Sequence, residues 1–160
     1  MKKILFTIAL LISFSSFGQK FNGYNHIAVP DVEYKDGSMD KYEMIPRIIK
    51  FFKKQGFNTL RVDDDGNIYD GEINTESPCE ILRLALDHTA PTYVQGYIAV
   101  DMTFRFYDCN DVEVMKFSSS YGANTAKKAI KKGVKKILEI IESRIGKYKF
   151  DPRKTPSQNK

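Results

Sequence analysis

Apolar and polar residues alternate along several segments of the chain, as they do in strands that bury one face and expose the other. The clearest alternation covers 79–88, where three leucines occupy every second position, and 97–107, where the alternating residues are aliphatic or aromatic. Shorter segments of the same kind predict strands at 26–32, 57–62 and 112–118. The pattern indicates about five strands, the last three forming an antiparallel meander.

Two other segments repeat their apolar residues every three or four positions, which predicts amphipathic helices. The first is predicted to begin with Ser38 as a cap and to end at Gly56, with Pro46 either kinking it or marking its true start. The second is predicted to be long and to be capped by Asn124 or Thr125. Each helix has one apolar stripe, so both suit the same face of one sheet.

The predicted order of elements is β-α-β-β-β-β-α. A strand-helix-strand beginning favours a parallel crossover, so the sheet should be mixed. We therefore predict an α+β two-layer sandwich, in which a mixed sheet of about five strands carries both helices on one face. The domain is expected to cover 19–146, with a long exposed loop at 63–78 and a basic, mobile tail at 147–160.

The first residues have the features of a secretory signal peptide. Lys2 and Lys3 precede an uncharged apolar run over 4–17, and small residues predict cleavage after Gly18. The run is shorter than the roughly 20 residues of a transmembrane helix, and no later segment predicts a transmembrane span. We expect residues 1–18 to be removed and the domain to work outside the cytoplasm, either in the periplasm or secreted.

The charge balance says little about a partner. The formal net charge is +5 at pH 7, and two of those positive charges lie in the predicted signal peptide. A mildly basic exported chain favours anionic surfaces without requiring them. Because exported proteins rarely meet nucleic acid, we expect no nucleic-acid partner.

The two cysteines lie near the ends of the two strongest predicted strands. If Leu84 faces Phe104, then Cys79 and Cys109 are directly opposite each other, and an exported chain favours a disulfide between them. That register has a cost, because it also opposes like charges. The opposed pairs are Arg83 with Arg105 and Asp87 with Asp101. A slip of two residues removes these pairs together with the cysteine pair, so a disulfide and two free thiols both stay open.

No motif for catalysis, a metal or a cofactor is present. The acidic segment 61–72 resembles a calcium loop, but Arg61 occupies the first ligand position, where a carboxylate is needed, so we interpret it as a solvated turn. His26 and His88 are the only histidines, and neither has metal-ligand spacing or a nucleophile motif. We expect no metal and no cofactor. A small enzyme of unrecognised type is a third hypothesis, after the two binding surfaces described next.

The candidate site is therefore a surface. If both helices cover the leucine and phenylalanine side of the meander, the other side of the sheet faces water. Arginine and tyrosine are enriched where proteins bind one another. The predicted binding residues are Arg83, Asp87, Tyr97, Asp101, Arg105 and Tyr107. The alternative is a solvated sheet face without a partner.

A second candidate surface is the outer side of the last predicted helix. Its lysines are Lys127, Lys128, Lys131, Lys132, Lys135 and Lys136. Such a basic face could bind an anionic polysaccharide or a lipid head group. It could equally be the solvated side of an amphipathic helix.

Three segments carry a resemblance to known proteins. They are GFNTLRVD, FRFYDCNDVEVM and ANTAKKAIKKGVKKILEII. In their order and pattern, the elements resemble small bacterial envelope domains of the TolB amino-terminal, CsgG and LpoB type. The resemblance implies a non-enzymatic role in protein interaction or assembly in a bacterial cell envelope, with an envelope protein or a second copy of the chain as the partner.

Overall fold

The computed structural model describes residues 21–33, 38–75, 77–146 and 148–158. The predicted signal peptide and its cleavage site lie outside these residues. The strands are β1 (His26–Pro30), β2 (Asn58–Val62), β3 (Ile68–Asp70), β4 (Ile81–His88), β5 (Thr92–Val94), β6 (Tyr97–Tyr107) and β7 (Glu113–Ala123). The long helices are α2 (Met44–Gln55) and α3 (Ala126–Ile145), and the short 3-10 helices are η1 (Phe21–Gly23), η2 (Pro78–Glu80) and η3 (Pro152–Lys154).

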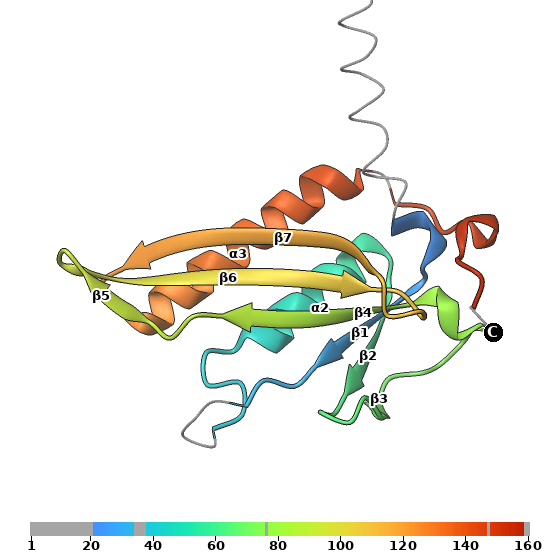
Figure 1. Ribbon diagram of the computed structural model, residues 1–160, viewed down its shortest axis with the longest axis horizontal. Coiled ribbons are helices and arrows are strands. Elements are labelled where there is room, and N and C mark those ends of the chain that lie inside the picture. Colours follow the sequence, from blue (N-terminus) through green and yellow to red (C-terminus); the bar gives the residue numbers. More distant parts are fainter. Residues whose placement is uncertain (1–20, 34–37, 76, 147, 159–160) are drawn as a thin grey trace, which may run out of the picture.

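The strands form one mixed sheet, as predicted. The order is β3-β2-β1-β4-β6, with β7 on the outer edge of β6 and β5 continuing beside β6 beyond the end of β4. β1 is parallel to β2 and β4, and the other pairs are antiparallel. The fold is therefore an α+β two-layer sandwich (Figure 1).

Two short strands were not predicted. β3 lies within 63–78, which the sequence predicts to be a loop, and β5 precedes the hairpin turn at Gln95 and Gly96. Both turn residues have positive φ, as a two-residue hairpin turn of type I′ requires. Each strand has only three residues and is largely exposed, so neither shows the alternation that identifies a strand in the sequence.

Both helices cover the same face of the sheet (Figure 1). Phe52 of α2 and Ile137 of α3 are fully buried, and Phe52 packs edge-to-face on Phe106 of β6 with 5.9 Å between the ring centres. A methyl group on Gly133 of α3 would lie 2.7 Å from the sulfur of Met102, so glycine allows α3 to approach β6 closely. The main core thus lies between the helices and one side of the sheet, while Ala28 and Leu60 are buried on the other side, where Gly71 lies close to Leu60.

The helix ends agree in part with the sequence. α2 begins at Met44 and not after Ser38, because the carboxylate of Asp40 accepts hydrogen bonds from the backbone N–H groups of Met44 and Ile45, at 2.6 and 3.1 Å. Pro46 lies in the first turn, where its missing N–H costs nothing. Gly56 ends α2 with a φ of 97°, as predicted.

The start of α3 follows one of the two predicted caps. The side chain of Thr125 accepts a hydrogen bond from the backbone N–H of Lys128 at 3.3 Å. This satisfies one of the N–H groups that have no partner within the first turn of a helix. Thr125, and not Asn124, is therefore the N-cap.

The predicted disulfide is present, but the register proposed for it is wrong. Leu84 pairs with Phe106, two residues from the predicted partner Phe104. Cys79 and Cys109 are bonded nevertheless, with 4.8 Å between their Cα atoms. Cys79 belongs to η2, which precedes β4, so its position is set by that turn and not by the strand register. The slipped register also separates the like charges that the predicted register would oppose.

The segment predicted to be a mobile tail packs against the start of the domain. The hydroxyl of Tyr148 donates to the carbonyl of Tyr24 at 2.6 Å, and its ring stacks on Phe57 with 3.9 Å between the ring centres. Further on, the N–H of Asp151 donates to the carbonyl of Asn22 at 2.7 Å. One aromatic anchor and backbone hydrogen bonds thus attach a segment whose composition is that of a disordered tail.

Candidate functional site: the open face of the sheet

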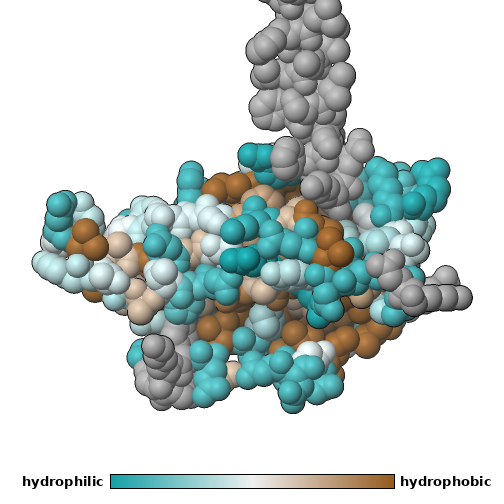
Figure 2. Space-filling model, in the orientation of Figure 1, coloured by the Kyte–Doolittle hydropathy of each residue, from teal (hydrophilic) through white to brown (hydrophobic). Residues whose placement is uncertain are grey.

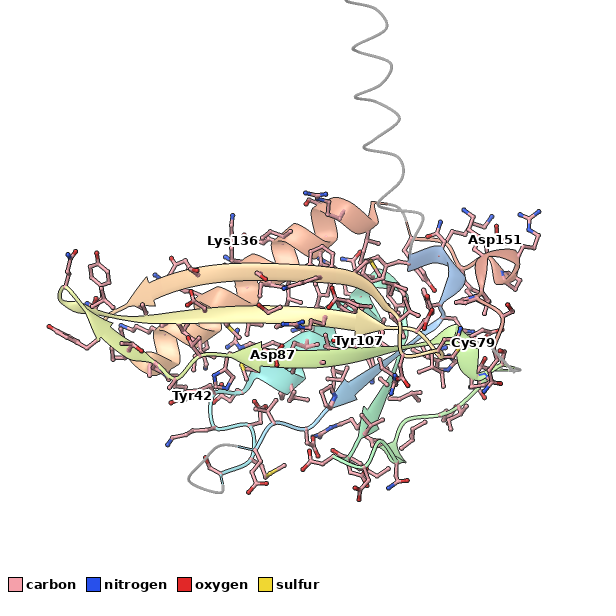
Figure 3. The ribbon with its side chains drawn as sticks, viewed as in Figure 1. Tyr42, Cys79, Asp87, Tyr107, Lys136 and Asp151 are labelled. Atoms are coloured by element: carbon pink, nitrogen blue, oxygen red, sulfur yellow. A yellow bond between two sulfur atoms is a disulfide. The ribbon has the colours of Figure 1, made fainter. Side chains whose placement is uncertain are left out.

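The face of the sheet opposite the helices carries all six predicted binding residues. Arg83 and Asp87 lie on β4, and the other four lie at odd-numbered positions of β6, whose even-numbered residues point into the core. Figure 3 places Asp87 and Tyr107 on adjacent strands of the side without helices. β7 contributes alternate residues to the same side, and we call this surface of β4, β6 and β7 the open face.

Arg105 lies on β6, the middle strand of the open face. Its Nε donates to Asp87 at 2.9 Å and one terminal nitrogen lies 3.5 Å from Glu113, so the guanidinium links β4, β6 and β7. The hydrogen bond to Asp87 raises the pKa of Arg105 above its usual value. The side chain is about one-third exposed, so a charged, held group is presented to solvent.

Polar contacts between β6 and β7 continue along the face. The hydroxyl of Ser120 donates to Asp101 at 2.5 Å, and the hydroxyls of Thr103 and Ser118 are 3.0 Å apart. These cross-strand pairs hold their side chains in fixed positions. The open face is therefore an ordered polar surface, which Figure 2 shows as mainly pale and teal residues along the long strands.

The predicted binding residues do not form one compact cluster. Tyr97 and Tyr107 lie at opposite ends of β6, about 33 Å apart at the usual rise of about 3.3 Å per residue. Arg83 forms an ion pair with Asp111, in the turn between β6 and β7. The structure brings Arg105 to Asp87 and places Arg83 opposite Tyr107, whereas Tyr97 lies next to the β5–β6 hairpin.

A cleft beside the open face was missed in the sequence. It lies between the end of β1 and the second half of β4 and has a volume of about 570 Å³. Its lining includes Asp31, Val32, Glu33, Leu86 and Asp87. Figure 2 shows exposed apolar residues in this part of the surface, below the long strands. Pro30 marks the place in the sequence, because it has no N–H with which to extend β1 alongside β4, but the sequence does not show which neighbouring strand Pro30 faces.

The lysines of α3 are accompanied by carboxylates. Lys127 and Lys131 lie 3.2 and 2.6 Å from Glu43, and Lys135 and Lys136 lie 3.7 and 3.9 Å from Glu139. Lys132 and Lys128 complete the predicted set, Lys132 over the ring of Tyr121. Because four of the six ammonium groups have acidic neighbours, this side of α3 is less positively charged than its sequence indicates. Figure 3 places Lys136 on α3, away from Asp87 and Tyr107.

The two histidines are too far apart to act together. His26 begins β1 opposite Ile81, and His88 ends β4, so the two lie about 23 Å apart at the usual strand rise. His26 is fully buried, and burial lowers the pKa of its imidazole. Among the described residues, no three His, Cys, Asp or Glu side chains are grouped as a metal site would require.

The acidic segment 61–72 forms the β2–β3 hairpin. Asp63 accepts a hydrogen bond from the N–H of Asn67 at 2.8 Å, which closes the turn. Arg61 forms an ion pair with Asp31 and lies over the ring of Tyr69. Asp63 thus closes the turn, and Arg61 pairs with a carboxylate outside the segment, in agreement with the interpretation as a solvated turn.

Comparisons with known proteins identify no family. No family model matches the chain, and no curated protein matches it. Among solved structures, the chain is similar to a dodecamer of a PelC variant from Paraburkholderia phytofirmans, at 14% identity over 77% of this chain and 88% of that one, with a TM-score of 0.43. A likeness at this level supports no argument about function, and the resemblance to the TolB, CsgG and LpoB group stays a prediction. None of the helices in the described ranges is long and apolar enough to cross a bilayer.

Proposed function

We propose that this chain is an exported, non-enzymatic domain of a bacterial cell envelope that binds a protein through the open face. The observation that carries the proposal is the one-sided sheet. One face is sealed by both helices, and the other presents ordered arginine, tyrosine and carboxylate side chains. A surface whose side chains are already held in place loses less conformational entropy on binding than a flexible one.

The size of the open face suits a protein partner. β6 and β7 are about 33 Å long and β4 is about 23 Å long, so at a spacing of about 4.8 Å the three strands present a projected area of roughly 430 Å². This is the same order as the roughly 800 Å² that each partner buries in a stable complex. Arg105 and Tyr107 are of the residue types that contribute most binding energy in protein interfaces.

Export is supported by the disulfide. Cys79 and Cys109 are joined, and such bonds form and persist in oxidising compartments. The predicted signal peptide and the resemblance to small envelope domains favour the same location. Binding of an anionic polysaccharide or a lipid by α3 is less favoured, because Glu43 and Glu139 offset the lysines.

The proposal is tested by measuring the binding of envelope proteins to the purified protein and to three variants. We expect Arg105→Ala and Tyr107→Ala to weaken binding at least fivefold, since truncating a central contact costs about 1–2 kcal/mol or more. Lys136→Ala, on the helix side, should bind like the unmodified protein. Thermal unfolding of each variant checks that Arg105→Ala changes binding and not folding, because exposed ion pairs contribute only about 0–1 kcal/mol to stability.

The dependence of binding on salt concentration distinguishes the open face from the lysine side of α3. Binding through the open face should persist in salt at a few hundred millimolar, whereas binding of an anionic polymer by exposed lysines should be lost. Binding that disappears in salt and in Lys136→Ala, and is unchanged in Arg105→Ala, would contradict the proposal and support the lysine face.

A further inference from the structure

The sheet opens between β1 and β4. The two strands pair only over three residues, from His26 opposite Ile81 to Ala28 opposite Arg83. β1 continues beside β2 to Pro30, while β4 continues beside β6 to His88. The second half of β4 therefore has a strand on one side only, although it lies in the middle of the sheet (Figure 1).

Hydrogen-bond directions show which backbone groups lie along this opening. The N–H of Thr89 donates to the carbonyl of Asp101, so the odd-numbered residues of β4 direct their backbone groups to β6. The groups of Leu84 and Leu86 then point the other way, toward the opening. Within the described residues, no strand pairs with this edge of β4 beyond Arg83.

Pro30 explains why the pairing stops. The N–H of Asp31 donates to the carbonyl of Val62, so the odd-numbered residues of β1 face β2 and the even-numbered ones face β4. If the parallel ladder continued, the next donor to the carbonyl of Leu84 would be the N–H of residue 30. Proline has none. The carbonyl of Leu84 and both backbone groups of Leu86 are therefore left facing the cleft.

The cleft between β1 and β4 is lined by apolar and acidic residues. Its volume of about 570 Å³ lies within the range of about 300–1,000 Å³ usual for ligand sites. Val32, Leu84 and Leu86 give it apolar surface. Its charged lining residues are all acidic, although the chain as a whole carries +5. They are Asp31, Glu33, Asp64 and Asp87.

We propose that this cleft binds an extended segment of a partner protein, which pairs with Leu84 and Leu86 as an added strand and carries lysine or arginine side chains. Exposed backbone groups of a strand are satisfied by strand addition, and alternate side chains of the added strand reach the apolar and acidic linings. Asp31 and Asp87 already form ion pairs with Arg61 and Arg105, so the carboxylates of Glu33 and Asp64 are the groups that select a basic segment. The proposal goes beyond binding by the open face and does not require it.

The edge limits the length of the added strand. Pro91 and the interruption between β4 and β5 break the edge after His88, as natural edge strands often do to prevent uncontrolled pairing. The edge of β4 that faces the cleft then runs only from Leu84 to Asp87. A segment of about five to six residues is expected to fill the site.

The probe is a blocked hexapeptide of alternating lysine and valine, added to the isotope-labelled protein and followed by NMR. We expect the amide of Leu86 to shift and to exchange its hydrogen at least tenfold more slowly with the peptide present, while the amides of Ala85 and Asp87, which already face β6, change less. The glutamate-valine peptide of the same length is the charge control. The lysine-valine peptide with alternate N-methylated amides is the backbone control.

Both control peptides should bind at least tenfold more weakly than the lysine-valine peptide. Equal binding of the N-methylated peptide would overturn the added strand, and equal binding of the glutamate peptide would overturn the selection of a basic segment. No change at Leu86 with millimolar peptide would overturn the site. Dimerisation through this edge without any peptide would show that a second copy, and not a basic segment, is the occupant.

Protein variants separate this site from the open face. Leu86→Pro removes the N–H that faces the cleft and should abolish peptide binding. The double variant Glu33→Gln with Asp64→Asn should weaken peptide binding at least fivefold. Because it leaves the backbone unchanged, it also tests the site if the proline variant does not fold. Tyr107→Ala, on the open face and outside the cleft lining, should bind the peptide normally. Loss of peptide binding in Tyr107→Ala but not in the Glu33 and Asp64 variant would overturn the proposal.

Discussion

One buried side chain, the imidazole of His26, makes the stability of this chain sensitive to pH. His26 is fully buried beside Asn25, and burial lowers the pKa of its imidazole below the usual 6.5, although the Glu72 carbonyl and Glu80 oppose this. The folded chain thus binds the proton less readily than the unfolded chain. Its stability should be complete above about pH 6.5 and should decrease as pH falls toward the lowered pKa.

We expect the free energy of unfolding, measured with urea, to decrease between pH 7 and pH 5 and expect His26→Gln to reduce this slope. The carboxylates of Asp63 and Asp151 have lowered pKa values and titrate at more acidic pH, so they contribute little in this window. An identical slope in the variant and the unmodified protein would show that His26 is not the responsible group.

Pro30 is the residue whose effect could be least well predicted. In the sequence it reads as the end of a strand, which is correct. Its larger effect depends on which neighbouring strand its missing N–H faces, and that requires the register of β1 with both β2 and β4. A single sequence does not contain that register, so the cleft could not be predicted.

At the scale of elements, the disulfide joins the start of β4 to the end of β6. Its cysteines are 30 residues apart. For a loop of this length, the chain-entropy model gives a stabilisation of about 3–4 kcal/mol. We expect Cys79→Ser with Cys109→Ser to lower the free energy of unfolding by this amount, or somewhat less because the β4–β6 pairing already restricts the chain. A loss below about 1 kcal/mol in urea unfolding would contradict a stabilising role.

The C-terminal segment offers a second test at this scale. Tyr148 contributes a ring stacked on Phe57 and a hydrogen bond to the Tyr24 carbonyl. Tyr148→Phe removes only the hydrogen bond and should cost about 1 kcal/mol. Tyr148→Ala also removes the ring and should cost about 3 kcal/mol. Equal stability of both variants and the unmodified protein would mean that the segment does not pack on the domain in solution.

Strand alternation predicted the long elements well, because burial of one face imposes a period of two on β4 and β6. It could not give the register, since a shift by two residues keeps every leucine and phenylalanine on the same face. Leu84 therefore pairs with Phe106 without any change in burial pattern. The cysteine pairing was correct for a different reason, because η2 brings Cys79 to Cys109.

At the scale of the whole molecule, both helices lie on one side of the sheet and leave the other side of β4, β6 and β7 uncovered. The six predicted binding residues lie on the uncovered side because they alternate with core residues, and that alternation is visible in the sequence. Their ion pairs and the adjacent acidic cleft come from contacts between strands far apart in the chain, such as Arg105 with Asp87. Such contacts appear only once the register is known.

Site-specific photo-crosslinking in the cells that make the protein tests the open face most directly. A photoreactive phenylalanine derivative would replace Tyr107 on the open face or, as the matched control, Lys136 on α3. We predict that light produces a defined protein adduct from position 107 and none from position 136, and that Arg105→Ala removes the adduct. Adducts formed only from position 136, or equally from both positions, would contradict binding through the open face.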